Sequence, residues 1–291
     1  MGLYPPFNLC FSLRAVFGAY HAKAYVALLL TFFEVFMTIR TYERSARSDA
    51  LVELIEDCPR LHEFERIIIF PIPTTRDGEH INGSEEKLSD AIKDAKEGVV
   101  VAGYGIPPDI SWRILDAGAQ VCDSLYDEEF LLENATLTAL ATLGIILTEQ
   151  TRSPKDLKVG IVGYGRIGRE LTRMLIYTGA APTVFTSRKS VCLELCECGV
   201  RAQMNTNVDL LKDLDILINT APAPVFGMES ADFPAALSII DLASGTNFPP
   251  LVGAKKYPSL PAKFYPYSAG HAWFNSIKRC ILGAESFISG E

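Results

Sequence analysis

Hydrophobic residues in the first half of this chain come in short continuous runs, each ended by turn-forming or glycine-rich residues. RIIIFP at 66–71 and GVVVAGYG at 98–105 are such runs, and AQVCDSL at 119–125 is a third. Their length and β-branched content predict buried strands. Helical spacing of apolar positions is found between and after them, at 85–95, 110–117 and 127–150. Strands that alternate with helices predict a parallel sheet covered on both faces.

The pattern restarts after the polar turn TRSPKD at 151–156. Further strands are predicted at 158–163, 182–187, 215–221 and 238–243, and helices from 166, at 190–198 and at 269–288. We therefore predict an α/β chain of two doubly wound parallel-sheet, Rossmann-like domains. The N-terminal domain is expected to be truncated or divergent, because residues 1–60 show no clean strand–glycine–helix opening.

The N-terminal part of the chain holds two helix signals. Ser48 has the residue type and position of an N-cap for a helix over 48–56. Residues 24–39 are strongly apolar, but Glu34 interrupts them and they are too short for an ordinary membrane span. We expect a buried helix there rather than a membrane segment.

Composition narrows the class of protein. A hydrophobic content of 48% with 21% charged residues is typical of a soluble globular chain. The net charge of −8 argues against a nucleic-acid partner, which needs clustered lysine and arginine. Seven scattered cysteines do not suggest a disulfide framework and favour a reducing, cytoplasmic location. Cys192, Cys196 and Cys198 form no CxxC pair, so no metal site is predicted.

One glycine motif carries the first functional hypothesis. Gly163-Tyr164-Gly165-Arg166-Ile167-Gly168 matches GxGxxG, follows an apolar strand directly and opens a helix. In that context Gly163 permits a tight turn, Gly165 lets a pyrophosphate approach the backbone, and Gly168 lets helix and strand pack closely. Amides at the helix start, including those of Arg166 and Ile167, would bind the phosphates. The motif predicts a dinucleotide site.

The end of the next strand indicates which dinucleotide. NAD-binding proteins usually place an acidic residue about 20 positions beyond the glycines to hold the ribose. This chain has Thr186, Ser187, Arg188 and Lys189 instead. Hydroxyls and cations suit a 2′-phosphate, so we predict NADP, with NAD as the alternative cofactor. Further along, Asn219, Thr220, Ala221 and Pro222 end another strand and would face the cofactor from the same sheet edge.

His271 is a candidate acid–base residue. It lies in a GHAW segment near the C-terminus, which is similar to the catalytic histidine segment of 2-hydroxyacid dehydrogenases. Histidine can exchange protons near neutral pH. A histidine at a helix N-terminus with no catalytic role is the alternative interpretation.

Four groups of residues together resemble the dipicolinate synthase family, specifically its A subunit. They are RIIIFPIPTTRDG (66–78), NATLTALATL (134–143), LKVGIVGYGRIGR (157–169) with ILINTAP (216–222) and IIDLAS (239–244), and SLPAKFYPYSAG (259–270). The resemblance covers about 48–291. It implies an N-terminal substrate domain, a C-terminal Rossmann domain and an active site in the cleft between them.

The resemblance also implies an activity and site residues. The activity would be oxidation of a dihydrodipicolinate-type precursor, a small dicarboxylate, to dipicolinate in spore-forming bacteria. Hydride would pass to NADP, and the partner would be a second, flavoprotein-like polypeptide of the synthase. The substrate side would be lined by Thr74, Thr75, Gly103, Asn134, Thr138, Lys263, Tyr267 and Ser268. Of these, Asn134 and Lys263 join His271 as catalytic candidates. Arg76, Lys263 and Arg166 are candidate cations for the substrate's carboxylates.

These predictions give four segments: a divergent segment 1–47, a substrate-side domain with its connecting helix at 48–150, a nucleotide-binding domain at 151–268, and a C-terminal helix packing back at 269–291. Two other hypotheses stay open. One is a 2-hydroxyacid dehydrogenase-like enzyme that uses His271. The other is a non-catalytic NADP-binding regulatory subunit, since Leu137 and Leu140 stand where the family has proline and glutamate. A homodimer would be usual for two-domain dehydrogenases.

Overall fold

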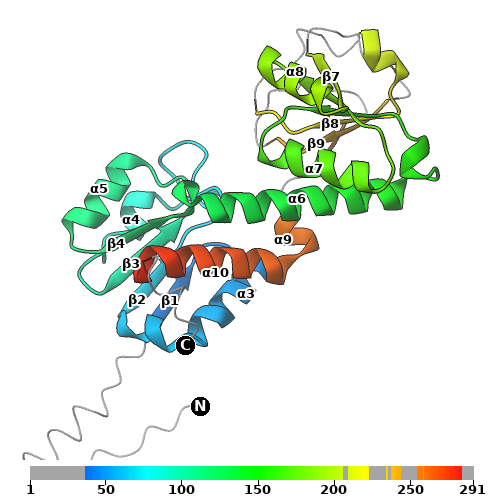
Figure 1. Ribbon diagram of the computed structural model, residues 1–291. Coiled ribbons are helices and arrows are strands. Elements are labelled where there is room, and N and C mark those ends of the chain that lie inside the picture. The colour runs from blue at the N-terminus through cyan, green and yellow to red at the C-terminus, as the bar shows by residue number, and fades with distance from the viewer. Residues whose placement is uncertain are drawn as a thin grey trace, which may run out of the picture.

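The first parallel sheet occupies the N-terminal domain of the computed structural model, which describes residues 37–205, 209–222, 234, 237–243, 254–257 and 259–283. Its strands are β1 (Thr38–Thr41), β2 (Arg66–Ile69), β3 (Val99–Gly103) and β4 (Gln120–Asp123). They lie side by side in chain order (Figure 1). All three pairings are parallel, so the four carboxyl ends meet at one edge.

Both faces of this sheet are covered by helices, as its continuous apolar strands require. Ile67 and Ile69 pack with α3 (Ala46–Glu56) and α10 (Pro266–Leu282) in one core cluster. Ile68, between them, faces the opposite side. There it packs with α4 (Leu88–Ala91) and α5 (Pro108–Asp116).

The second sheet is doubly wound. Its strands are β5 (Val159–Val162), β6 (Thr183–Thr186), β7 (Arg201–Met204), β8 (Ile216–Asn219), β9 (Ser238–Asp241) and β10 (Ala254–Lys256). The spatial order is β10-β9-β8-β5-β6-β7, so the winding direction reverses between β5 and β8. Two parallel sheets with helices on them confirm the predicted Rossmann-like α/β class. The reversal point is where such sheets bind ligands.

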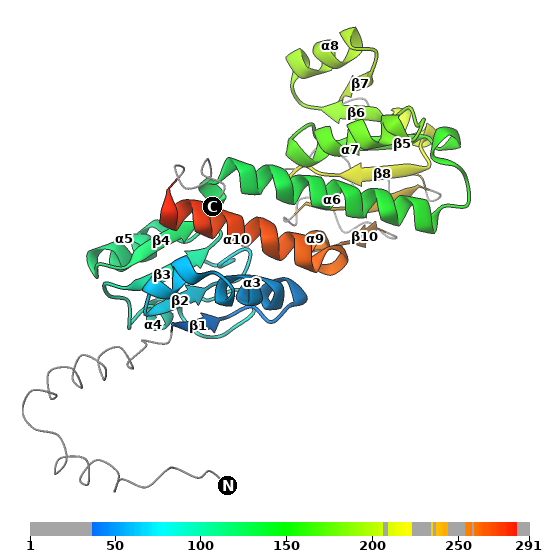
Figure 2. The ribbon, with the colours of Figure 1, turned by 60° about the horizontal axis from the view of Figure 1, so that its bottom comes forward.

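Helix α6 (Glu128–Glu149) joins the two domains and belongs to both cores (Figures 1 and 2). Phe130, near its start, is buried in the core of the first domain. Ile145 and Ile146, near its end, are buried with α7 (Arg166–Tyr177) against the second sheet. α6 is also long and apolar enough to cross a membrane, but 44% of that apolar window is buried inside the protein.

The remaining helices complete the two domains. α8 (Lys189–Glu197) covers β6 and β7 through Val191 and Leu195. After the second sheet, α9 (Leu260–Phe264) leads into α10, which returns to the first domain and packs along α3 (Figure 2). Short 3₁₀ turns lie at η2 (Pro59–Glu63), η3 (Ser124–Tyr126), η4 (Pro154–Asp156) and η5 (Asp209–Asp213).

The structure corrects several predicted boundaries in the first domain. Thr38 and Ile39 lie in β1 and not in a helix, and residues 24–36 are outside the described residues. Helix α3 begins before residue 48: Ser45 is its N-cap, and Ser48 completes a capping box with it. The first sheet therefore starts ahead of 48, with an opening strand that the sequence did not reveal. The helix predicted at 85–95 shrinks to α4.

Two further differences concern edge strands and cysteines. β7 and β10 were not predicted, because RAQM and AKK are short and largely polar, as sheet edges often are. Cys122 and Cys280 form a disulfide across 158 residues, although cysteine spacing gave no sign of a bond. The C-terminal helix predicted at 269–288 begins earlier, and residues 284–288 lie outside the described residues.

Gly270 tests the contact between α10 and α3. A Cβ there would lie 2.8 Å from the Arg47 carbonyl oxygen and 2.9 Å from the Ala50 Cβ, so Gly270→Ala should separate the helices and cost about 1–3 kcal/mol of unfolding free energy. Gly144, inside α6, is the matched control because its Cβ would meet nothing within 4 Å. Gly144→Ala should stabilise the protein by up to about 1 kcal/mol through helix propensity. Urea denaturation measures both, and equal effects would contradict the close-packing argument.

Candidate functional site

The glycine loop after β5 is packed tightly on one side and open on the other. Gly163 has a φ of +91°, which favours glycine, and a Cβ on it would lie 2.9 Å from the Thr220 hydroxyl. A Cβ on Gly168 would lie only 2.3 Å from the Gly163 carbonyl oxygen. A Cβ on Gly165 would meet nothing within 4 Å. The loop therefore leaves open space at the glycine predicted to face a pyrophosphate.

The start of α7 offers its backbone amides to that space. Gly165 is the N-cap, no side chain caps the helix, and the first turn carries no acidic residue. The first amides of an uncapped helix lack partners within the helix and favour an anion. Because α7 runs on to Tyr177, its dipole adds to this preference.

The end of β6 brings a predicted cation onto the glycine loop. The Arg188 guanidinium donates a hydrogen bond from Nη2 to the Tyr164 carbonyl oxygen, at 3.0 Å. Thr186 is buried, and its hydroxyl accepts from the Arg188 amide at 3.2 Å. Ser187 and Lys189 are exposed beside it. Arg169, which the sequence analysis did not single out, lies over the Tyr164 ring at 5.5 Å. Two arginines therefore contact Tyr164, Arg188 at its backbone carbonyl and Arg169 at its ring.

Arg166 points across to the first domain. Its guanidinium makes a two-pronged ion pair with Glu128, with Nη2 to Oε2 at 2.6 Å and Nε to Oε1 at 2.9 Å. This bonding holds the pKa of Glu128 below its ordinary value. Burial raises the pKa of Tyr104, and the positive charge of Arg166 acts on it in the opposite direction. The loop after β3 and the loop after β5 therefore approach one another around Arg166.

A buried polar pair closes the edge of the second sheet at β8 and β9. The Asn219 amide donates to Asp241 Oδ1 at 2.9 Å and accepts from the Ala221 amide at 3.1 Å. The structure thus places Asn219 in support of Asp241 at this sheet edge, and its predicted position facing the cofactor stays a prediction. Thr220 donates to the Val162 carbonyl and braces the glycine loop. Pro222 lies exposed at the end of this segment.

Asp241 has an oxygen that the fold leaves unsatisfied. Its Oδ2 is buried without a hydrogen bond among the described residues, and the Lys256 ammonium is 3.9 Å away, beyond hydrogen-bonding distance. A buried acceptor without a partner is unusual and calls for a ligand or water donor. Sequence analysis could treat this aspartate only as a strand end, since the signal is the burial itself.

The predicted substrate residues Thr74 and Gly103 lie at the ends of neighbouring segments of the first sheet and contact one another. The buried Thr74 hydroxyl accepts from the Tyr104 amide at 2.9 Å, and a Cβ on Gly103 would lie 2.6 Å from that hydroxyl. The Thr75 hydroxyl donates a hydrogen bond to Asp77 Oδ1 in the following turn. Thr74 and Gly103 therefore hold two strand ends together and leave little polar surface for a substrate.

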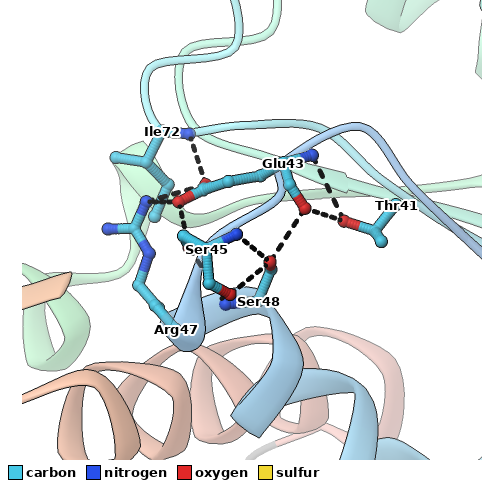
Figure 3. Close-up of polar contacts among 6 residues, drawn as sticks. All are labelled: Thr41, Glu43, Ser45, Arg47, Ser48 and Ile72. Carbon is cyan, nitrogen blue, oxygen red and sulfur yellow. Dashed lines mark hydrogen bonds and ion pairs between the residues drawn. The ribbon is translucent and has the colours of Figure 1, made fainter.

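A second network at the same edge was missed by the sequence analysis (Figure 3). Glu43 accepts from Arg47 Nη2 at 2.6 and 2.7 Å, from the Ser45 hydroxyl and from the Ile72 amide. Arg47 is 4% exposed, and its guanidinium lies 5.3 Å from the centre of the Trp273 ring. The network ties β1, α3 and the segment after β2 together. Its sequence signal was the acid and arginine four residues apart, in a segment that had no predicted strand.

The remaining candidates lie on α6, α9 and α10. Tyr267, Ser268 and His271 line a hollow of about 520 Å³ between α6 and α10, together with Leu132, Glu133, Thr136 and Leu137. The His271 ring stacks on Tyr267, and its Nδ1 lies 3.3 Å from the Asn275 amide nitrogen.

Asn134, Thr138 and Lys263 do not line this hollow. Thr138 is buried and donates to the Asn134 carbonyl, whereas Lys263 is exposed on α9. The structure therefore brings together only part of the predicted substrate set.

Comparison with known proteins gives structural relatives. No family model matches this sequence, and no curated protein matches it. The crystal structure of the A subunit of dipicolinate synthase from Bacillus halodurans aligns with a TM-score of 0.66 at 17% identity, over 84% of this chain and 97% of that one. The corresponding polypeptide of dipicolinate synthase from Bacillus subtilis gives 0.64 at 18%, over 87% and 97%. A transhydrogenase from Sinorhizobium meliloti gives 0.54 at 13%, over 83% and 92%. At these identities the likeness shows the fold: two Rossmann-like domains.

The Asn219–Asp241 pair yields a stability prediction. Asn219→Ala removes the side-chain amide donor to Asp241 Oδ1, and should cost about 1–3 kcal/mol of unfolding free energy. Asn219→Asp should cost more at neutral pH, since two adjacent carboxyls cannot both be ionised. Repulsion raises the folded pKa of the introduced carboxyl, so its penalty should grow as pH rises above about 4. Urea denaturation at pH 4 and pH 7 measures this, and a pH-independent gap between the variants would contradict the pairing.

Proposed function

We propose that this protein is an NADP-dependent oxidoreductase of the dipicolinate synthase type, similar to the A subunit of that enzyme, which oxidises a dihydrodipicolinate-type precursor. The observation that carries the proposal is the glycine loop with an open Gly165, an uncapped α7 and Arg188 on its carbonyl. The sequence resemblance and the fold shared with two such polypeptides support the type of enzyme. The proposed location is the cytoplasm.

The residues present fit a nicotinamide dinucleotide. Amides of Gly165, Arg166 and Ile167 would hold the pyrophosphate at the start of α7. The Asp241 Oδ2 is a buried acceptor at the neighbouring strand end, and would accept from the carboxamide of the nicotinamide. When bound, the cofactor supplies the hydride chemistry. The protein's part is to orient the two rings and keep water away.

NADP is favoured over NAD by charge. Arg188 keeps donors in addition to the one used on Tyr164, and Ser187 and Lys189 lie beside it. A 2′-phosphate at the end of β6 would meet cations and hydroxyls, which bind phosphate by charge-assisted hydrogen bonds.

The substrate side is proposed to bind a small dicarboxylate. Of the three candidate cations, Arg166 is paired with Glu128, and Arg76 donates to the Asn82 amide oxygen. Lys263 is exposed on α9 and has no ion-pair partner among the described residues, so of the three its charge is the one not already engaged by a neighbouring side chain. The flavoprotein-like second polypeptide of the synthase is the proposed partner for complete turnover.

A second candidate function is a non-catalytic NADP-binding regulatory subunit. Leu140 is 39% exposed on α6, where the resembling family has an acid. An exposed leucine cannot exchange a proton, so this position favours binding without turnover. By contrast, His271 contacts the Asn275 amide and forms no ion pair with a carboxylate among the described residues, although Glu133 lines the same hollow, and this weakens the 2-hydroxyacid dehydrogenase hypothesis.

Cofactor choice is tested by titration. The wild-type chain should bind NADPH at least about tenfold more tightly than NADH, and Arg188→Ala should weaken NADPH binding by about 10- to 100-fold with little effect on NADH. Arg201→Ala is the matched control, because Arg201 is exposed at the amino end of β7, the opposite edge of the same sheet. It should change neither affinity. Equal NADPH and NADH affinities in the wild-type chain would refute the 2′-phosphate argument.

Turnover is tested by incubating the full chain with NADP and a dihydrodipicolinate-type substrate, with and without the flavoprotein-like partner. The absorbance of the reduced nicotinamide should rise and dipicolinate should form. Gly165→Val is the control: its side chain enters open space, so it should fold but lose nucleotide binding and turnover.

Two results would redirect the assignment. Tight NADP binding without any absorbance change would leave the regulatory hypothesis. Activity on a 2-keto acid that disappears in His271→Ala would establish the 2-hydroxyacid dehydrogenase alternative.

A further inference from the structure

The Cys122–Cys280 disulfide joins β4 of the first domain to the last turn of α10. Cys122 is in β4 and Cys280 is in the last turn of α10, with their Cα atoms 5.7 Å apart. Cys122 is 2% exposed, whereas Cys280 lies at the surface. Cys58, Cys192, Cys196 and Cys198 are free thiols. Pairing among the described cysteines is therefore selective.

The Cys122–Cys280 bond can be reached from solvent on the side of Cys280. A hollow of about 460 Å³ reaches it and is lined by Cys122, Asp123, Tyr126, Asp127, Glu128, Glu129, Ser276, Arg279 and Cys280. A small thiol can enter such a space and reach the exposed Cys280 sulfur. Reactivity of a disulfide depends on this access.

The residues around the bond connect α10 with the start of α6. The Ser276 hydroxyl donates to the Ser124 hydroxyl at 2.9 Å, and both are buried. The Arg279 guanidinium donates to Asp127 Oδ2 at 2.7 Å and pairs with Glu129 at 2.7 Å. Asp127 is the N-cap of α6 and accepts from the Phe130 amide. Fixing the last turn of α10 therefore also fixes the first turn of α6.

That first turn contains the contact with the glycine loop. Glu128 follows the N-cap directly and holds Arg166 at the start of α7. The disulfide is thus linked to the start of α7 through Arg279, which is next to Cys280 in the chain, and through the first turn of α6, where Arg279 pairs with Asp127 and Glu128 pairs with Arg166. α6 leads from the first sheet to the second (Figure 1), and the disulfide lies beside its first turn because Cys122 and Cys280 line one hollow with Asp127, Glu128 and Glu129.

We propose that Cys122–Cys280 is a reversible redox lock, opened by a dithiol, that sets the rigidity of the last turn of α10 and the first turn of α6. A dithiol thiolate attacks the Cys280 sulfur, the S–S bond breaks, and Cys122 leaves and takes a proton. The second thiol then attacks the mixed disulfide and releases Cys280. The dithiol becomes a disulfide, and the protein pair gains two electrons and two protons.

The burial of Cys122 and the exposure of Cys280 determine which sulfur a thiolate can attack and which part of the structure can loosen on reduction. Attack at Cys280 is open, whereas Cys122 remains in the core on reduction. Trp273 and Ile277 also stay buried against the sheet, so α10 does not detach. Reduction should loosen only the turns beyond that anchor.

The full chain is prepared oxidised and then treated with dithiothreitol under native conditions. Peptide mapping should find the Cys122–Cys280 linkage before treatment and two free thiols after it. Hydrogen exchange in residues 276–283 and 124–131 should then become at least about tenfold faster. Residues 183–197, which make none of the contacts above, should not change.

Cys280→Ser should reproduce the reduced exchange pattern without any reductant, because it removes only the exposed sulfur. Cys58→Ser, at a half-buried free thiol, is the matched control and should behave as wild type. The lock is overturned if the linked peptide is absent, if dithiothreitol opens the bond only after unfolding, or if oxidised and reduced chains exchange alike. None of these readouts depends on cofactor binding or turnover.

Discussion

Helix α6 has to bury apolar side chains in two cores at once, and the rest of the architecture depends on this. Its early residues pack with the first sheet and its later residues with α7 and the second sheet. A helix with one apolar face could satisfy only one of these domains. Because α6 is apolar on most of its surface, it packs against both domains along its length. The loops after β3 and β5 consequently approach one another near its start, around Arg166.

The carboxyl edges of the two sheets share one electrostatic feature. Carboxylates at strand ends are held by donors from neighbouring segments: Glu43 by Arg47 and the Ile72 amide, Asp241 by Asn219. In each case burial makes an unpaired atom costly, so the donors are obligatory. At the first sheet, donors bond to both carboxylate oxygens of Glu43. At the second sheet, Asp241 Oδ2 has no hydrogen bond among the described residues. The two edges therefore differ in how completely their carboxylates are bonded.

The sequence predicted the elements whose pattern is continuous and apolar. RIIIF, VVVAG, KVGIV and the long helix were found close to their observed bounds, and the two-sheet class is confirmed. β1, β7 and β10 could not be found, because four or fewer partly polar residues at an edge give no periodic signal.

For the site, the sequence predicted the residues that form a local motif. The structure places Arg188 against the glycine loop, whereas its predicted contact with a 2′-phosphate stays a prediction. The link from Glu43 to the Ile72 amide, the Asp241 oxygen without a hydrogen bond and the disulfide depend on segments far apart in the chain that only folding brings together. Cofactor and substrate contacts stay predictions.

The return of α10 to the first domain has a consequence for synthesis. The first sheet is covered on one face by α3 and by this last helix, so Trp273 and its neighbours complete a core whose strands emerge much earlier. Domains usually fold as their own residues leave the ribosome. Here the second domain can assemble while the first still exposes Ile67, Ile69 and Leu51. The core of the N-terminal domain can therefore be completed only after α10 has been synthesised, although most of that domain is made first.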